Sequence, residues 1–551
     1  MSKRRRDKNQ SQYRDVGLLE LEAIVERGKT APLSAEDSTT LLVTFQTFAF
    51  LQQELKTKGA SIERLRQIIF GSKSEKTSDV LAKSDAQSGP TAPAAQPTGE
   101  VAERAKKPGH GRNAATAYKG AKKVKVPHLA LTTGQFCAEC QTGKLYPLAE
   151  PAVLVRITGM APLGADVYEC DRLRCNLCGE VFTAPAPEGV GDAKYDETAT
   201  AMTGLLKYGT GVPFNRLEKL QLGMGIPLPA ATQWELVRDG ADLLEPAYEE
   251  LIHQAAQGVV LYNDDTAMKV LALSAAQRAA AATDEETDGR TGVFTTGIVS
   301  TREGRRIALF FTGVQHAGEN LADVLARRKL ELPTPIQMCD ALSRNTSGDF
   351  KTLVANCVAH SRRKYIAVAE EFPEECRFVL ETLGAVYNND ALARQRKLSA
   401  DERLRFHQAE SGPLMEALDK WLRQQLDERK VEPNSGLGEA IGYMRKHWPK
   451  LTLFLQQPNA PLDNNLCERA LKKAILHRKN SLFYRSATGA RVGDVYMSLI
   501  HTAELCEVAP FEYLVALLKH HRAVATAPGD WMPWNYEATL ARGGAAAAPQ
   551  S

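Results

Sequence analysis

Three short runs of β-branched and aromatic residues decide the fold class: VVLYND at 259–264, GVFTTGIVS at 292–300 and RIALFFTG at 306–313. Turn residues bound each run, so the pattern predicts three successive strands. An amphipathic helix, ENLADVLARR at 319–328, and a fourth short strand, PIQMCD at 335–340, follow them. The predicted order of elements is therefore β-β-β-α-β.

This order is that of an RNase H-like core, in which two strands and a later helix each supply an acid. The candidates are Asp264, Asp340 and Glu468. Mg²⁺ prefers carboxylate oxygen, and two such ions can activate the attacking oxygen and stabilise the leaving oxygen of a phosphodiester. Since successive side chains on a strand face opposite sides, only one of Asp264 and Asp265 can point into the site. Each acid taken alone is more often a cap or a solvated turn, so the hypothesis depends on their joint placement.

The third acid lies in a basic segment, PLDNNLCERALKKAILHRKNSLFYRSATGA at 461–490. Asp463 is placed to cap a helix on which Glu468 and Lys472 are four residues apart. Glu468 is either one half of a surface ion pair or a metal-binding carboxylate whose basic neighbours neutralise DNA phosphates. The candidate phosphate contacts are Arg469, Lys472, Lys473, Arg478 and Lys479, together with Arg362 and Arg363 near His360, although a charged helix face is usually just solvated.

Helical patterns surround the core. Residues 189–254 contain two short amphipathic segments separated by Gly and Pro, which permits a DNA-binding helix-turn-helix. The core takes residues 255–345 and resumes at 461–503, where the third acid lies. The stretch 346–460 between them predicts an all-helical insertion, and residues 504–551 close the chain with a helix and a Trp/Pro-rich tail.

The N-terminal third differs from the rest in composition. Residues 1–36 predict a basic, flexible start, and residues 37–78 carry apolar residues at heptad spacing. This stripe fits either a self-associating coiled coil or a helical hairpin packed within its own domain. SGPTAPAAQPTG at 88–99 lacks bulky side chains, so residues 79–112 predict a disordered basic linker.

Two C-x-x-C pairs, CAEC at 137–140 and CNLC at 175–178, predict a zinc-binding domain over residues 113–188. Cys137, Cys140, Cys175 and Cys178 would surround one Zn²⁺ and leave no open position, so the ion would be structural. Cys170 is a substitute ligand. The alternative is four unligated thiols.

Composition sets broad limits. The chain has 551 residues, of which 43% are hydrophobic and 25% charged, with a formal net charge of +3. These values are typical of multidomain globular proteins. No apolar run approaches the roughly 20 residues of a membrane span, and the start lacks the apolar core of a signal peptide, so we expect a cytoplasmic protein.

Several motifs together resemble the insertion sequence 66 family of DDE transposases. DNNLCERALKKAILHRKNSLFYRSATGA resembles its third-acid signature, LYNDDTAMKVL its first-acid strand and MCDALSRN its second-acid segment. The similarity extends to other segments: LRQIIFGSKSEK, KKPGHGR, VPFNRLEKLQLGMGIPLPAATQWELV, CVAHSRRKY and WMPWNY. It covers about residues 37–536.

The resemblance implies a DNA transposase that cleaves the ends of its mobile element and joins them to target DNA. It implies that Asp264, Asp340 and Glu468 are catalytic and hold two Mg²⁺ or Mn²⁺ ions, and that the zinc domain binds DNA ends. The expected partners are DNA, a second copy of the chain or more, and small accessory proteins of the same element. Ala267, the ALSRN segment, Lys472 and Lys473 depart from the family pattern, which bears on target preference. The alternatives are a structure-specific RNase H-like nuclease and a zinc-dependent DNA-binding regulator or inactive relic.

Overall fold

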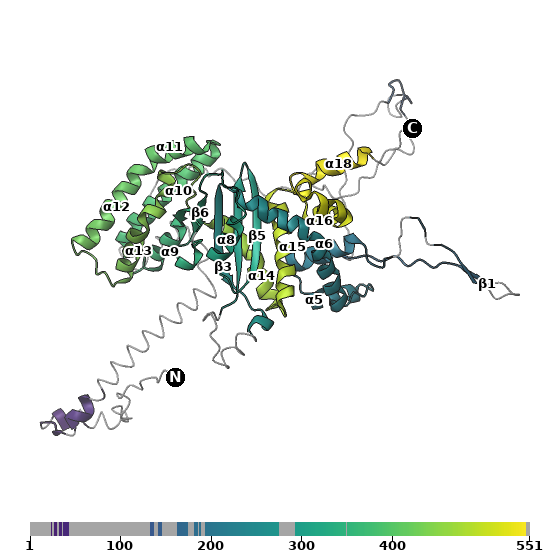
Figure 1. The fold of residues 1–551 in the computed structure, drawn as a ribbon. Helices are drawn as coiled ribbons and strands as arrows, with labels where there is room; N and C mark the ends of the chain where they lie inside the picture. Colours follow the sequence, from purple (N-terminus) through teal and green to yellow (C-terminus); the bar gives the residue numbers. More distant parts are fainter. Residues whose placement is uncertain are drawn as a thin grey trace. The chain divides into compact units, whose positions relative to one another are not determined.

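The computed structural model describes residues 193–274, 292–348 and 350–546, with short pieces between 24 and 44 and between 133 and 188. Of the predicted heptad stripe, Leu41 and Thr44 are helical, and its other positions lie outside the described residues. The linker at 79–112 and the four predicted zinc ligands also lie outside them. The largest described part is a mixed sheet between two groups of helices (Figure 1).

The sheet has five strands in the order β5-β4-β3-β6-β7. Their bounds are β3 Val260–Ala267, β4 Phe294–Arg302, β5 Arg305–Gly313, β6 Ile336–Cys339 and β7 Leu353–Asn356. The first three pair in antiparallel fashion, whereas β6 and β7 join in parallel to β3. Helix α8 (Ala317–Leu325) lies between β5 and β6 in the chain. The predicted β-β-β-α-β order is thus confirmed.

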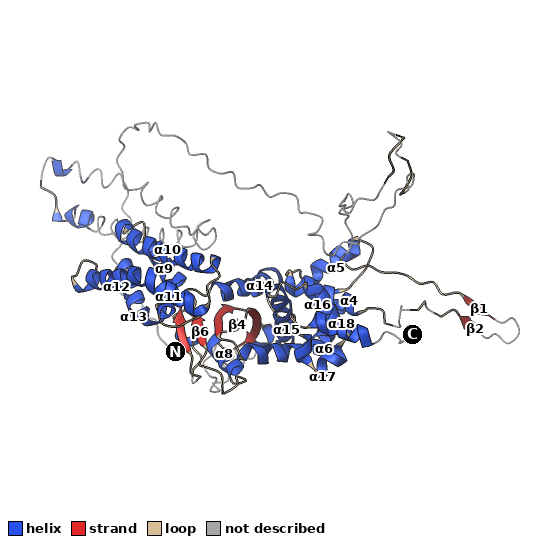
Figure 2. Cartoon of the chain, turned by 90° about the horizontal axis from the view of Figure 1, so that it is seen from above, coloured by secondary structure: helices blue, strands red, loops and turns tan. Residues whose placement is uncertain are grey.

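Strand β7 corrects the expectation that residues 346–460 are entirely helical. Its four residues, LVAN, run toward the helix that follows with no Gly or Pro between them, so neither of these turn residues marks the end of the strand in the sequence. They pair with β6 from Ile336↔Leu353 to Cys339↔Asn356. The rest of the insertion is helical: α9 Val358–Ala367, α10 Pro373–Gln395, α11 Ala400–Glu410, α12 Gly412–Asp427 and α13 Gly436–Leu451. These helices gather at the β6–β7 side of the sheet (Figure 2).

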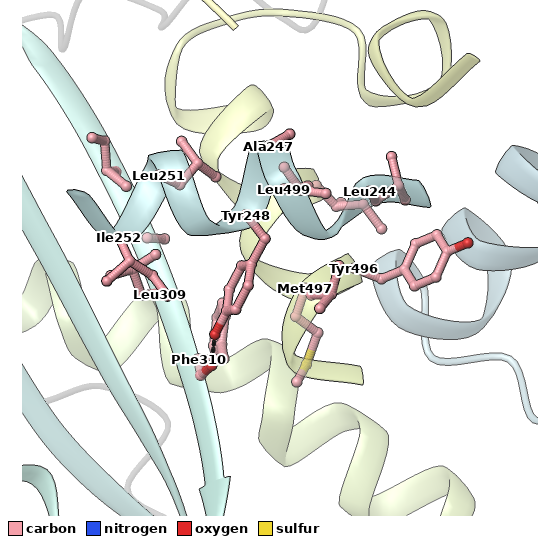
Figure 3. Close-up of a cluster of buried hydrophobic side chains, with 14 of the residues drawn as sticks. Leu244, Ala247, Tyr248, Leu251, Ile252, Leu309, Phe310, Tyr496, Met497 and Leu499 are labelled. Carbon is pink, nitrogen blue, oxygen red and sulfur yellow. Dashed lines mark hydrogen bonds between the residues drawn. The ribbon is translucent and has the colours of Figure 1, made fainter. Parts of the chain in front are cut away.

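The predicted helical stretch before the sheet comprises α4 (Glu197–Gly204), a π-helical turn (Leu205–Gly209), α5 (Phe214–Gly223) and the long α6 (Ala230–Ala256). A short turn joins α5 to α6, and DNA reading by this pair stays a prediction. One face of α6 is apolar along most of its length. Tyr248 and Ile252 of α6 point toward Phe310 and Leu309 of β5 (Figure 3), and the Tyr248 hydroxyl donates to the Phe310 carbonyl at 3.1 Å.

The C-terminal helices complete this core. They are α14 Asn465–Ser481, α15 Ala487–Leu505, α16 Pro510–Lys519, α17 His521–Thr526 and α18 Tyr536–Ala546. Helix α14 lies across β3 and β4, where Gly297 permits close approach: a Cβ there would meet Leu471 at 2.9 Å. The Cys467 thiol donates to the Gly297 carbonyl at 3.2 Å. Among the described residues, no helix combines the length and the apolar character that a membrane span requires.

Leu251→Ala should lower the free energy of unfolding by about 2 to 5 kcal/mol, because it leaves a cavity at a fully buried position of α6 in the hydrophobic core. Leu243→Ala on the same helix is the control, since Leu243 is 40% exposed, and it should cost less than about 1 kcal/mol. Urea denaturation of both variants measures the difference. Equal losses would contradict this description of the core.

Candidate active site

Asp264 and Asp265 point to opposite faces of β3. The Asp265 carboxylate is almost fully buried, accepts a hydrogen bond from Thr296 Oγ1 at 2.9 Å and lies 3.1 Å from His316 Nδ1. The Asp264 carboxylate lies on the other face, toward the residues that follow β6. Asp265 is therefore a structural residue on the face of β3 that contacts Thr296 and His316. Asp264, on the opposite face, is the member of the pair that reaches the candidate site.

Asp340 follows the last residue of β6, the parallel neighbour of β3. One amide links the two acids: Asn345 Nδ2 donates to Asp340 Oδ1 at 2.5 Å and lies 3.4 Å from Asp264 Oδ1. The structure thus brings together two acids that are far apart in the sequence.

Asn345 is a site residue that the sequence analysis missed. It ends a short 3₁₀ turn, Ser343–Asn345, and is itself buried. Its carbonyl accepts hydrogen bonds from Asn263 Nδ2 at 2.8 Å and from Gln337 Nε2 at 2.7 Å. These two amides come from β3 and β6, so the strands that carry the acids also fix the residue that bridges them. The only signal in the sequence is that polar Asn263 and Gln337 interrupt apolar strands.

The electrostatics of Asp264 reflect this crowding. Burial, together with the negative charges of Asp340, Glu468 and Asp265, raises its pKa to about 7, although the Asp265 N–H donates to it at 2.8 Å and opposes the shift. A nearby cation would favour the ionised carboxylate by offsetting both effects. The site therefore suits a positively charged ligand.

Glu468 lies in the first turn of α14, whose start is fixed from two sides. Asn464 Nδ2 donates to the Asn263 carbonyl at 3.1 Å, and the Asn464 N–H donates to Cys357 Sγ at 3.2 Å. The Glu468 carboxylate itself pairs with Arg363 of α9, with Nη2 to Oε2 at 3.1 Å. The charge of Glu468 reaches Asp264 and raises its pKa, but the ion-pair partner of Glu468 is Arg363 of the insertion.

A second group of ligand atoms shares Glu468. One ligand atom each from Cys357, His360 and Glu468 lies within 4.8 Å of the others. Thiolate, imidazole and carboxylate are ligands that zinc accepts, whereas the oxygens of Asp264 and Asp340 suit Mg²⁺. Burial raises the pKa of the Cys357 thiol to about 11, so this thiol is protonated at neutral pH unless a metal displaces the proton.

The predicted phosphate-binding residues fall into two groups. Arg469, Lys472 and Lys479 are exposed on α14. The other four, Arg362 among them, are partly buried. Lys473 contacts the Gly209 carbonyl and Glu504, and Arg478 contacts Thr266 and the Ala267 carbonyl. Arg363 contacts Glu468.

The cysteine region is described only in fragments. Strands β1 (Arg172–Arg174) and β2 (Val181–Thr183) form an antiparallel hairpin. In the sequence, Cys175 and Cys178 lie between these strands, outside the described residues. Cys170 is described and half-buried. Zinc ligation by the four cysteines stays a prediction.

Asp264→Asn should change how stability depends on pH. A raised carboxyl pKa stabilises the folded state at low pH, and this contribution is lost as the pH rises from about 4 through about 7. In buffer with a chelator, the wild-type free energy of unfolding should therefore fall by about 2 to 4 kcal/mol relative to Asp264→Asn between about pH 4 and pH 8. Denaturation across this range measures it, with Asp323→Asn on the exposed side of α8 as the control. Parallel profiles for wild type and Asp264→Asn would contradict the raised pKa.

Comparison with known proteins places the chain in a family. A family model described as "Transposase IS66 family" matches residues 193–492, which include the sheet and all three acids. The chain is 28% identical over 385 residues to the uncharacterized protein y4jD of Sinorhizobium fredii, covering 67% of this chain and 71% of the relative. It is 24% identical over 505 residues to the uncharacterized protein y4hP of the same organism, covering 86% and 88%. Because the family model spans more than half of the 551 residues, the family predicted from the motifs is confirmed, and the chain belongs to the IS66 family of transposases.

Proposed function

We propose that the chain is a DNA transposase that cuts the ends of its mobile element and joins them to target DNA by metal-dependent phosphoryl transfer. The observation that carries the proposal is the meeting of Asp264, within β3, with Asp340, directly after the end of the parallel strand β6, bridged by Asn345. The sheet order, with three antiparallel strands and two parallel ones, supports an RNase H-like core. The position of α14 beside β3 supports Glu468 as the third acid.

The donor set fits divalent cations that prefer oxygen. Asp264 and Asp340, with Glu468, would hold Mg²⁺ or Mn²⁺, and a pair of such ions lowers the barrier by stabilising charge on the attacking and leaving oxygens. The raised pKa of Asp264 supports this assignment, since a cation there offsets the repulsion among the acids. Asp265 stays outside the site with Thr296 and His316, and it maintains the orientation of β3.

Glu468 must exchange partners before it can join the two aspartates. In the structure its carboxylate is bound by Arg363. DNA offers Arg363 an alternative anion, because guanidinium binds phosphate as well as carboxylate. We infer that arrival of a DNA phosphate at α9 frees Glu468 for metal binding, so that the acids assemble fully only on substrate.

The remaining partners follow from the sequence. Cys137, Cys140, Cys175 and Cys178 would hold one structural Zn²⁺ in a domain that helps to bind element ends. Transposition at two ends implies at least a homodimer in the DNA complex, and accessory proteins of the same element are further expected partners. The Arg363–Glu468 pair is also the one observation that favours the alternative of a DNA-binding regulator. If Glu468 stayed bound to Arg363, it would not hold a metal, and the protein would bind DNA without catalysis.

Asp340→Asn should abolish cutting and joining while DNA binding stays within about threefold of wild type. The loss should be about 1,000-fold or more, since metal-borne charge stabilisation is worth several kcal/mol. The assay uses purified full-length protein, labelled element ends and Mg²⁺, with Asp323→Asn as an exposed-acid control.

The same assay separates the alternatives. Cut but unjoined ends in wild type indicate the nuclease, and binding without cutting indicates the regulator. Unchanged joining by Asp340→Asn would refute the assigned acids.

Purified protein should contain one tightly bound zinc ion per chain, because four thiolates bind it with no open position. Elemental analysis measures the content, and Cys175→Ser should reduce it. Cys506→Ser, a half-buried thiol at the end of α15, should not. Metal content near zero in wild type purified without chelator would argue for four unligated thiols.

A further inference from the structure

Helix α14 has one exposed stripe along its whole length. Its buried face consists of residues that pack on the sheet: Cys467, Ala470, Leu471, Ala474 and His477. The exposed positions advance in steps of three and four through Arg469, Lys472, Leu476 and Lys479. Residues at this spacing share one side of a helix. The α14 stripe, defined by these four residues, therefore presents three cations and one apolar side chain to solvent.

The stripe ends at a strained turn. Leu482 has φ +69° and ψ −43°, and the Phe483 N–H donates to the Ser481 carbonyl at 2.8 Å. This is a three-residue turn of the positive-φ kind, which is rare for residues with a Cβ. It leaves Leu482 64% exposed and Phe483 40% exposed. Two large apolar side chains thus project at the end of a basic helix face.

The surrounding structure holds this turn on both sides. The Leu482 N–H donates to the Arg478 carbonyl at 2.9 Å, which continues the helix into the turn. Immediately after it, the Tyr484 N–H donates to the Lys269 carbonyl at 2.8 Å, and the buried Tyr484 ring stacks on His477 at 4.4 Å. The conformation is therefore imposed by packing, and it is not the fraying of a helix end. Imposed strain with exposed apolar groups is typical of functional sites.

The chemistry of this surface fits duplex DNA. Lys479 and Arg485, both exposed, flank Leu482 and Phe483 and complement phosphates. Leucine and phenylalanine are side chains that insert between base steps and unstack them. Duplex DNA thus complements both parts of this surface: its anionic backbone fits the α14 stripe, and its stacked bases fit Leu482 and Phe483.

The spacing along α14 sets where the insertion falls. Fourteen residues separate Glu468 from Leu482, or about 20 Å along a helix at about 1.5 Å per residue. Duplex DNA rises about 3.4 Å per base pair, so this length corresponds to about six base pairs.

We propose that the α14 stripe follows the backbone of an element end and that Leu482 and Phe483 insert into a base step about six base pairs from the phosphodiester presented to the acids. The inference rests on the proposed function and specifies how the substrate is held. Local unstacking would also let the DNA bend toward α9, where Arg363 lies.

The test uses full-length protein and duplexes that carry the terminal repeat of the encoding element, with 2-aminopurine at one position at a time. Fluorescence should rise severalfold on binding at the step about six base pairs from the cut and little elsewhere. Leu482→Gly combined with Phe483→Ser should abolish the rise and weaken binding by about tenfold. Since glycine relieves the positive φ, Leu482→Gly alone should melt no lower than wild type, which shows that the fold is intact.

Two controls sharpen the outcome. Leu330→Ser removes an apolar side chain that is 99% exposed elsewhere, and it should leave fluorescence and affinity unchanged. The double variant Lys472→Gln/Lys479→Gln should release about two fewer counterions on binding DNA, which lowers the salt dependence of its affinity. It should keep the rise in 2-aminopurine fluorescence at saturating protein. A rise that persists in the Leu482/Phe483 double variant, or is missing in wild type, overturns the proposal. If the wild-type protein cuts DNA without the rise in fluorescence, the proposed function stands and the insertion of Leu482 and Phe483 is wrong. If the wild-type protein neither binds nor cuts DNA, the proposed function and the insertion both fail.

Discussion

Parallel pairing of β3 with β6 is the constraint on which the candidate site depends. It brings Asp264 and Asp340 together at the edge formed where β6 ends beside the longer β3, although the chain between them makes a hairpin and a helix. Two carboxylates at that edge repel one another in a partly buried setting, and the Asn345 amide offsets this by donating toward both. The same repulsion is what makes the edge attractive to divalent cations.

Helix α14 connects this edge to the rest of the molecule. It packs closely because residue 297 has no side chain, and its start is fixed by Asn464, which contacts both β3 and the beginning of α9. The third acid, the basic stripe and the strained turn therefore occupy one rigid element. A shift of α14 would move all three together, so the proposed DNA contacts at its far end would be coupled to the position of Glu468.

Several features on or near the candidate site are unfavourable for stability. Asp264 is ionisable and crowded by like charges, Leu482 adopts a rare backbone conformation, and large apolar side chains remain exposed beside it. Local rules of sequence and structure are commonly broken in this way at functional sites. The Arg363–Glu468 pair offsets the negative charge of the third candidate acid.

The sequence by itself determined the order of the first four core strands and α8, because β-branched and aromatic runs bounded by turn residues mark the strands and an amphipathic pattern marks the helix. It also pointed to Asp264 within β3 and to Asp340 after β6, and its motifs indicated the family to which the chain belongs. Tertiary structure alone decided the rest. No Gly or Pro separates β7 from the helix after it, and Asn345 becomes a bridge only when β3 and β6 pair. The engagement of Glu468 by Arg363 joins two helices across the insertion, and such contacts between distant side chains leave no local pattern in a sequence.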